Sequence, residues 1–130
     1  MQADQPDTGN KKKILVVDDN QDSRELVIKI LGKQNYHLLE AYDGEDALNK
    51  IMAEKPDLVL MDISMPKIDG YEVTRRLKNM EDYKDITIIA LTAHAMKGDC
   101  EKALGVGCKG YITKPINIRE FSEQIKRYLR

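Results

Sequence analysis

Apolar residues occur along the chain in two alternating kinds of segment. The first kind is a short, mostly apolar run without alternating polar positions, which is typical of a strand buried on both faces of a parallel sheet. Residues 14–17, 58–61 and 86–91 form such runs. Residues 37–41 and 109–112 are weaker candidates of the same kind. The pattern therefore predicts five strands.

The second kind of segment is longer and amphipathic, with apolar residues on one helical face. These faces consist of Leu26, Val27, Ile30 and Leu31; of Ala47, Leu48, Ile51 and Met52; of Val73, Leu77 and Met80; and of Ile118, Phe121, Ile125 and Leu129. Asp43, Asp69 and Asn117 each stand three positions before an Asp or Glu, a spacing typical of helix N-termini. Strands that alternate with helices predict one α/β domain, a doubly wound five-stranded parallel sheet flanked by five helices.

Composition narrows the class of protein without identifying it. The chain has 130 residues, enough for one domain, and its net charge of -1 argues against sequence-independent nucleic-acid binding. No apolar run approaches the roughly 20 residues of a membrane span. The polar start lacks a secretory signal, and we expect a disordered tail over residues 1–11 and a folded domain over residues 12–130. The Met1 start and this tail favour a stand-alone protein over the alternative, a piece of a larger hybrid kinase. Cys100 and Cys108 have no metal-ligand or disulfide-framework spacing, which favours reduced thiols in the cytoplasm.

Polar residues gather where the predicted strands end. The first strand runs into Asp18 and Asp19, the third into Asp62, the fourth into Thr92, and the fifth into Thr113, Lys114 and Pro115. Ligands of open α/β sheets bind beyond the carboxyl ends of the strands. The sequence therefore predicts a site at that edge with three carboxylates, a hydroxyl and an ammonium group.

These residue types suit phosphoryl transfer assisted by a metal ion. Three neighbouring carboxylates repel one another, and Mg²⁺, which prefers oxygen ligands, relieves that repulsion. A carboxylate can attack phosphorus to form an aspartyl phosphate, while a lysine and a hydroxyl bind phosphoryl oxygens. Phosphoryl transfer depends mainly on positioning and charge neutralisation, which this set provides.

Four motifs in this order resemble the receiver domains of two-component response regulators. They are Ile14–Asn20 (ILVVDDN), Leu60–Pro66 (LMDISMP), Ala90–Ala93 (ALTA) and Tyr111–Pro115 (YITKP). The resemblance extends over the chain from Lys12 onward. It implies a flavodoxin-like fold with strand order 2-1-3-4-5 and a phosphorylation-dependent switch that signals by protein–protein interaction.

The resemblance also implies a role for each site residue. Asp62 would accept a phosphoryl group from the phosphohistidine of a histidine kinase or histidine phosphotransfer protein, in a reaction where the chain catalyses only its own phosphorylation and dephosphorylation. Mg²⁺ would be bound directly by Asp19, Asp62 and the backbone carbonyl of Ser64, and through water by Asp18. Lys114 would pair with Asp62 and then with the phosphoryl group, and the Lys114–Pro115 bond would be cis.

Regulation and output are implied in the same way. Thr92 would move toward the phosphoryl group and Tyr111 would turn inward behind it, remodelling a face to which a downstream protein or a second copy of the chain binds. Ser64 and His94 stand at positions where the family varies its hydrolysis rate.

Simpler interpretations and other functions compete with this one. Asp18 and Asp19 could be helix caps, Thr92 a capping hydroxyl, and Tyr111 a core residue. A scaffold that never takes phosphate is a second function, although every key side chain is present. An aspartate phosphatase is a third, but Asp18-Asp19-Asn20 lacks its spacing of two alternate aspartates. Residues 105–110 match the dinucleotide pattern GxGxxG, but a predicted helix precedes them and a strand follows, so we expect them to end that helix.

Overall fold

Strands and helices alternate strictly through the chain. The computed structural model describes residues 11–129, except residue 66 and residues 94–96. The strands are β1 (Lys12–Val17), β2 (Tyr36–Ala41), β3 (Leu58–Asp62), β4 (Thr87–Thr92) and β5 (Gly110–Thr113); the helices are α1 (Gln21–Leu31), α2 (Gly44–Glu54), α3 (Gly70–Lys78), α4 (Lys97–Val106) and α5 (Ile118–Leu129). All strand pairs are parallel, in the order β2-β1-β3-β4-β5. The predicted fold class and strand order are confirmed.

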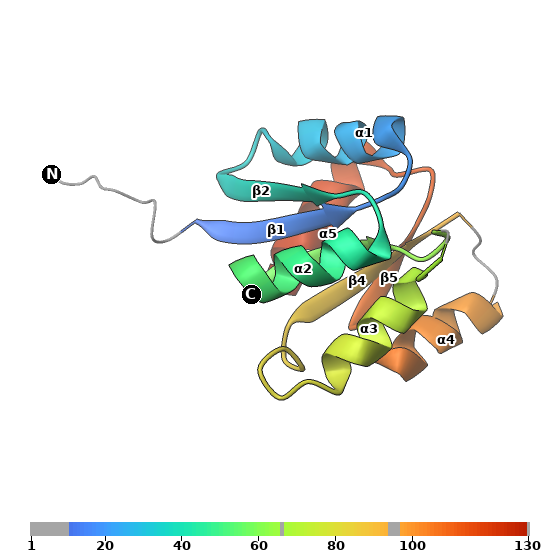
Figure 1. The fold of residues 1–130 in the computed structure, drawn as a ribbon. Helices are drawn as coiled ribbons and strands as arrows, with labels where there is room; N and C mark the ends of the chain where they lie inside the picture. Colours follow the sequence, from blue (N-terminus) through green and yellow to red (C-terminus); the bar gives the residue numbers. More distant parts are fainter. Residues whose placement is uncertain (1–10, 66, 94–96, 130) are drawn as a thin grey trace, which may run out of the picture.

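The helices cover both faces of the sheet. Helices α1 and α5 lie on one face, and α2, α3 and α4 lie on the other (Figure 1). Successive residues of a strand point to opposite faces, so Leu15 and Val17 pack toward α2 and α3, whereas Ile14 and Val16 pack toward α1 and α5. Two hydrophobic cores, one on each face, hold the carboxyl ends of the central strands in place.

The strength of each sequence signal follows the position of the strand in the sheet. Strand β3 is entirely buried, β4 is buried except at Thr87, and β1 is buried from Ile14 onward, which is why the sequences of these strands contain continuous apolar runs. Strand β2 lies at an edge, where only Ala41 of its six residues is buried, and β5 forms the other edge. An edge strand needs fewer apolar residues, so its sequence pattern is weaker.

The predicted helix starts are confirmed by their hydrogen bonds. The side chains of Asp43, Asp69 and Asn117 accept hydrogen bonds from the backbone N–H groups three residues later. Helix α1 is capped by Asn20, whose side chain accepts from Ser23 N, so the interpretation of Asp18 and Asp19 as its caps is wrong.

Two further details concern helix ends. The expectation that Met80 belongs to the third helical face is wrong, because α3 ends at Lys78 and Met80 packs against the core from the following turn. Gly107 directly follows α4 with a φ of 116°, a conformation that residues with a side chain rarely adopt. Gly107 thus ends α4, as predicted, whereas Gly105 lies within α4 and Gly110 begins β5. The dinucleotide interpretation stays rejected, because a helix precedes these glycines and a strand follows them.

Some expectations lie partly outside the described residues. The predicted tail covers residues 1–11, of which only Lys11 is described, and His94 also falls outside. Cys100 and Cys108 carry free thiols. Within residues 11–129, apart from the gaps named above, no helix has the length and apolar character needed to cross a bilayer.

Candidate functional site

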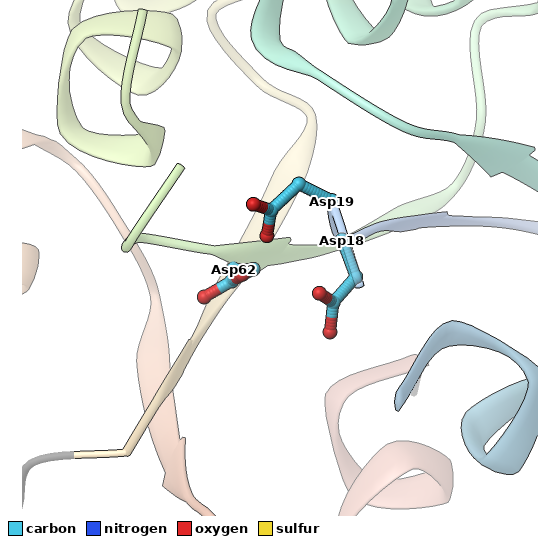
Figure 2. A group of neighbouring side chains, drawn as sticks. All are labelled: Asp18, Asp19 and Asp62. Atoms are coloured by element: carbon cyan, nitrogen blue, oxygen red, sulfur yellow. The ribbon is translucent and has the colours of Figure 1, made fainter. Parts of the chain in front are cut away.

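Three carboxylates meet at the carboxyl edge of the sheet. Asp18 and Asp19 follow the end of β1, and Asp62 is the last residue of β3, the neighbouring strand (Figure 2). One carboxylate oxygen from each residue lies within 4.8 Å of the other two. Asp18 and Asp62 are buried, whereas Asp19 is exposed to solvent. The predicted convergence of these side chains is confirmed.

Every polar group of Asp18 has a hydrogen-bond partner. Its N–H donates to Ala41 O (3.1 Å), and its carbonyl accepts from Nη1 of Arg24 (2.8 Å). One carboxylate oxygen accepts from Asn20 N (2.9 Å) and the other from Nζ of Lys114 (3.0 Å). Asp18 is therefore held rigidly, and its carboxylate is committed to partners within the protein.

Asp62 is buried without full compensation of its charge. Its side chain is 7% exposed, and burial raises the pKa of its carboxyl to about 6. The neighbouring Asp18 raises this pKa further, while the Ser64 N–H (3.1 Å from Oδ1) and the Lys114 ammonium lower it. At neutral pH the group is ionised, and it gains from any cation placed beside it.

Lys114 reaches the acidic residues from the loop that follows the edge strand β5. Its Nζ lies 3.0 Å from Oδ2 of Asp18 and 4.0 Å from Oδ1 of Asp62, so its closer contact is with Asp18. Its backbone N–H donates to Thr92 O (2.7 Å), which fixes the loop after β5 against the end of β4. The Lys114–Pro115 peptide bond is cis, as the family resemblance implied.

Thr92 and Tyr111 occupy different environments. Thr92 is buried at the end of β4, one residue beyond Leu91, which pairs with Asp62 in the sheet. Tyr111 is 40% exposed on β5, so the interpretation as a core tyrosine is wrong for this structure. A hydrogen bond with the Cys100 side chain on α4 is the main cause of the raised pKa of Tyr111. The tyrosine side chain thus lies outward, against α4.

Sequence reasoning missed Arg24. This residue of α1 contacts the Asp18 carbonyl and also pairs with the carboxylate of Glu40 on β2 (Nε to Oε1, 3.0 Å). One signal could have drawn attention to it. A cation near the N-terminus of a helix is unfavourable beside the positive end of the helix dipole, so a compensating partner is expected there.

The acidic cluster fits a hard divalent cation. Mg²⁺ binds oxygen ligands at about 2.0–2.1 Å and usually takes one or two carboxylates, with water completing its shell. Asp62 has uncompensated charge, and no hydrogen bond to the Asp19 carboxylate is found within the described part of the chain. Two carboxylates are therefore able to accept an ion, with Asp18 held beside them.

Comparison with known proteins decides the family. The family model described as response regulator receiver domain matches residues 14–126. The chain belongs to this family. Receiver domains are the phosphorylation-dependent switches of two-component signalling, and they interact with histidine kinases and with targets. Receiver domains bind Mg²⁺ in an acidic site, and this receiver domain has a cluster of three aspartates.

Named relatives agree with that assignment. The polar-differentiation response regulator DivK of Brucella anthropi is 40% identical over 118 residues, which cover 91% of this receiver domain and 96% of the relative. The chemotaxis protein CheY4 of Vibrio cholerae has a TM-score of 0.86 at 28% identity, covering 92% of this chain and 99% of the other. The receiver domain of the sensor histidine kinase PA1611 of Pseudomonas aeruginosa has a TM-score of 0.84 at 32% identity, covering 92% and 98%; its structure has a magnesium ion coordinated in the active-site cleft.

Proposed function

We propose that Asp62 is the phosphoacceptor of this receiver domain and that phosphohistidine is the donor. In this proposal Asp19, Asp62 and the backbone carbonyl of Ser64 hold Mg²⁺ directly, and Asp18 acts through water. The observation that carries the proposal is the buried Asp62 carboxylate, whose Oδ1 lies 4.0 Å from the Lys114 ammonium. Its raised pKa indicates that its negative charge is incompletely compensated, so a bound cation would stabilise it. The chain catalyses only its own phosphorylation and dephosphorylation.

The reaction needs an ionised nucleophile and donors for the phosphoryl oxygens. An Asp62 carboxylate oxygen forms a bond to phosphorus as the bond between phosphorus and the donor's imidazole nitrogen breaks, and that nitrogen then takes up a proton. Lys114 and Thr92 donate hydrogen bonds to phosphoryl oxygens. When bound, Mg²⁺ neutralises charge that develops on those oxygens. No general base is needed, because Asp62, with a pKa of about 6, is mostly ionised at neutral pH.

Thr92 and Tyr111 would transmit the effect of phosphorylation from Asp62 to the surface of the domain. We propose that Thr92 moves toward the phosphoryl group and that Tyr111 leaves its outward position beside Cys100 to turn inward. This shifts a pre-existing equilibrium between two states and creates no new fold. The surface formed by α4, β5 and α5 would change shape, and a downstream protein or a second copy of the chain would bind there.

An exposed apolar surface beside the site suits the donor protein. Leu26 on α1 and Ile118 on α5 are exposed, and a cavity between α1 and the β5–α5 loop is lined by Leu26, Lys114 and Ile116 among others. Because this cavity reaches Lys114, a protein bound there would stand close to Asp62. We propose this surface for the histidine kinase or histidine phosphotransfer protein.

The extent of the domain and its compartment complete the proposal. We assign the receiver domain to residues 12–130, since β1 begins at Lys12 and α5 continues to Leu129. The cytoplasm is proposed as its compartment because both cysteines carry free thiols, which a reducing environment preserves.

Phosphoryl uptake tests the assignment of Asp62. The protein is incubated with acetyl phosphate and Mg²⁺ and its intact mass is measured, with Asp62→Asn as the matched variant. We expect the wild-type chain to gain one phosphoryl group and the variant none, and we expect chelation of Mg²⁺ to prevent the gain.

The same experiment separates the other functions. A folded Asp62→Asn protein that still gains the phosphoryl group would refute the assignment. Sustained turnover of small phosphate esters would favour a phosphatase, and absence of both the adduct and Mg²⁺ binding would favour a scaffold.

Leu26→Asp is expected to separate the two kinds of donor. A charge in an apolar interface should slow transfer from a phosphohistidine protein by about 10-fold or more, because burying an unpaired carboxylate against an apolar partner costs binding free energy. Uptake from acetyl phosphate, which needs no docking surface, should stay at the wild-type rate. Both rates are measured by the mass of the product against time.

Leu104→Asp is the matched control for that surface. Leu104 is 48% exposed on α4 and Leu26 is 44% exposed on α1, so the two substitutions cost the fold about the same. Equal slowing of transfer in both variants would contradict the placement of the donor on α1.

A further inference from the structure

Arg24 connects three elements around the acidic site. Its Nη1 donates to the backbone carbonyl of Asp18 (2.8 Å), and its Nε donates to Oε1 of Glu40 (3.0 Å). Only 16% of its side chain is exposed. Arg24 thus joins α1 to the end of β1 and to the edge strand β2.

The planar peptide group links the contact between Arg24 and Asp18 to the position of the next residue, Asp19. The carbonyl oxygen of Asp18 lies in the same planar unit as the nitrogen and Cα of Asp19. A hydrogen bond that fixes the Asp18 carbonyl therefore fixes the position of the Asp19 Cα as well. Asp19 needs this support because its exposed carboxylate has no partner of its own in the described part of the chain.

The positive charge of Arg24 is neutralised by Glu40, which lies outside the acidic cluster. Glu40 accepts from its guanidinium, and Lys50, which contacts the Glu40 backbone carbonyl, pairs with Asp46 (3.3 Å). Lys114, in contrast, places its charge on the carboxylates themselves. The two cations near the site therefore differ in what they act on: Lys114 acts on the charge, and Arg24 acts on the backbone.

We infer that Arg24, paired with Glu40, is a positioning residue that directs the Asp19 carboxylate toward the cation. This inference rests on the proposed function, because it assumes that Asp19 binds Mg²⁺. Groups that orient metal ligands typically contribute 10- to 100-fold to affinity or activity. Arg24 touches neither the ion nor the phosphoryl group in this arrangement.

Mg²⁺ titrations of single variants test the role of Arg24. The chain contains no tryptophan, so binding is followed by the amide NMR signals of Asn20 and Ser64. We expect Arg24→Ala to weaken Mg²⁺ binding by roughly 10-fold and Arg24→Lys, which keeps one donor, to weaken it less. Asp19→Ala measures how far Mg²⁺ affinity falls when a proposed direct ligand is removed. Arg76→Ala is the control, since Arg76 forms a comparable pair with Glu72 on the surface of α3 and should keep wild-type affinity.

Phosphoryl uptake distinguishes positioning from simple loss of structure. With acetyl phosphate and saturating Mg²⁺, the rate of Arg24→Ala should return toward that of wild type, whereas at low Mg²⁺ it should fall in step with binding. A protein that is merely less stable would bind Mg²⁺ with normal affinity in its folded fraction, which the NMR signals report separately.

The outcomes identify which proposal fails. Wild-type affinity in Arg24→Ala, or equal losses in Arg24→Ala and Arg76→Ala, would overturn the role of Arg24 and leave the proposed function intact. Absence of Mg²⁺ binding by the wild-type protein would overturn the proposed function and this inference together.

Discussion

Asp62→Asn is expected to make the metal-free protein more stable at neutral pH, by about 1–3 kcal/mol in the free energy of unfolding. Burial and the neighbouring Asp18 raise the pKa of Asp62 from 3.8 to about 6. A change of this size corresponds to at most about 3 kcal/mol of unfavourable free energy for the ionised form. Asparagine has nearly the same shape and carries no charge, so it removes that cost.

The sign of the pH dependence follows from the raised pKa. Between about pH 4 and pH 6 the folded protein binds the Asp62 proton more tightly than the unfolded chain does, so wild-type stability falls as the pH rises through this range. The variant lacks this group. The difference in stability between variant and wild type should therefore be small near pH 4 and reach its full value above pH 7.

Urea unfolding at several pH values, with a chelator present, measures this difference. Added Mg²⁺ is the internal control, because an ion that binds only the folded wild-type protein stabilises it by about 2.7 kcal/mol at 100 times its dissociation constant. The advantage of the variant should shrink accordingly. A variant less stable than wild type at pH 7.5 without metal would contradict the view that Asp62 carries uncompensated charge.

Lys114→Met is expected to slow phosphoryl uptake from acetyl phosphate by roughly 100-fold or more, the usual cost of removing one donor that stabilises developing charge. Methionine keeps an unbranched apolar chain but lacks the ammonium group. The same substitution should strengthen Mg²⁺ binding, because Lys114 lies 3.0 Å from Asp18 and 4.0 Å from Asp62 and its positive charge opposes a second cation there. Opposite effects on transfer and on metal affinity distinguish this role from general damage to the site.

Initial rates of uptake and NMR titrations with Mg²⁺ measure the two effects. Lys67→Met is the matched control: Lys67 is exposed in the loop after β3, and it makes no hydrogen bond or ion pair with the acidic cluster in the described part of the chain. It should keep both the wild-type rate and the wild-type affinity. A parallel loss of rate and Mg²⁺ affinity in Lys114→Met would contradict the proposed division of roles.

Local patterns in the sequence predicted the fold class and the residues of the site, whereas the strand order came from the family resemblance. Continuous apolar runs predicted the buried strands β1, β3 and β4, and the side chains of Asp43, Asp69 and Asn117 predicted three helix starts. Because the carboxyl ends of parallel strands lie at the same edge of a sheet, the sequence predicts that the residues after those strands lie close together. Such features depend on near neighbours in the chain.

The tertiary structure alone decided how the site residues differ from one another. Asp18 and Asp19 are adjacent and chemically identical, yet one is buried with every polar group bonded and the other is exposed. The pKa of Asp62, the outward position of Tyr111 and the contact between Arg24 and Asp18 depend on burial and on groups from other elements. Electrostatic energy depends on distance and local polarity in the folded chain, and spacing along the sequence specifies neither.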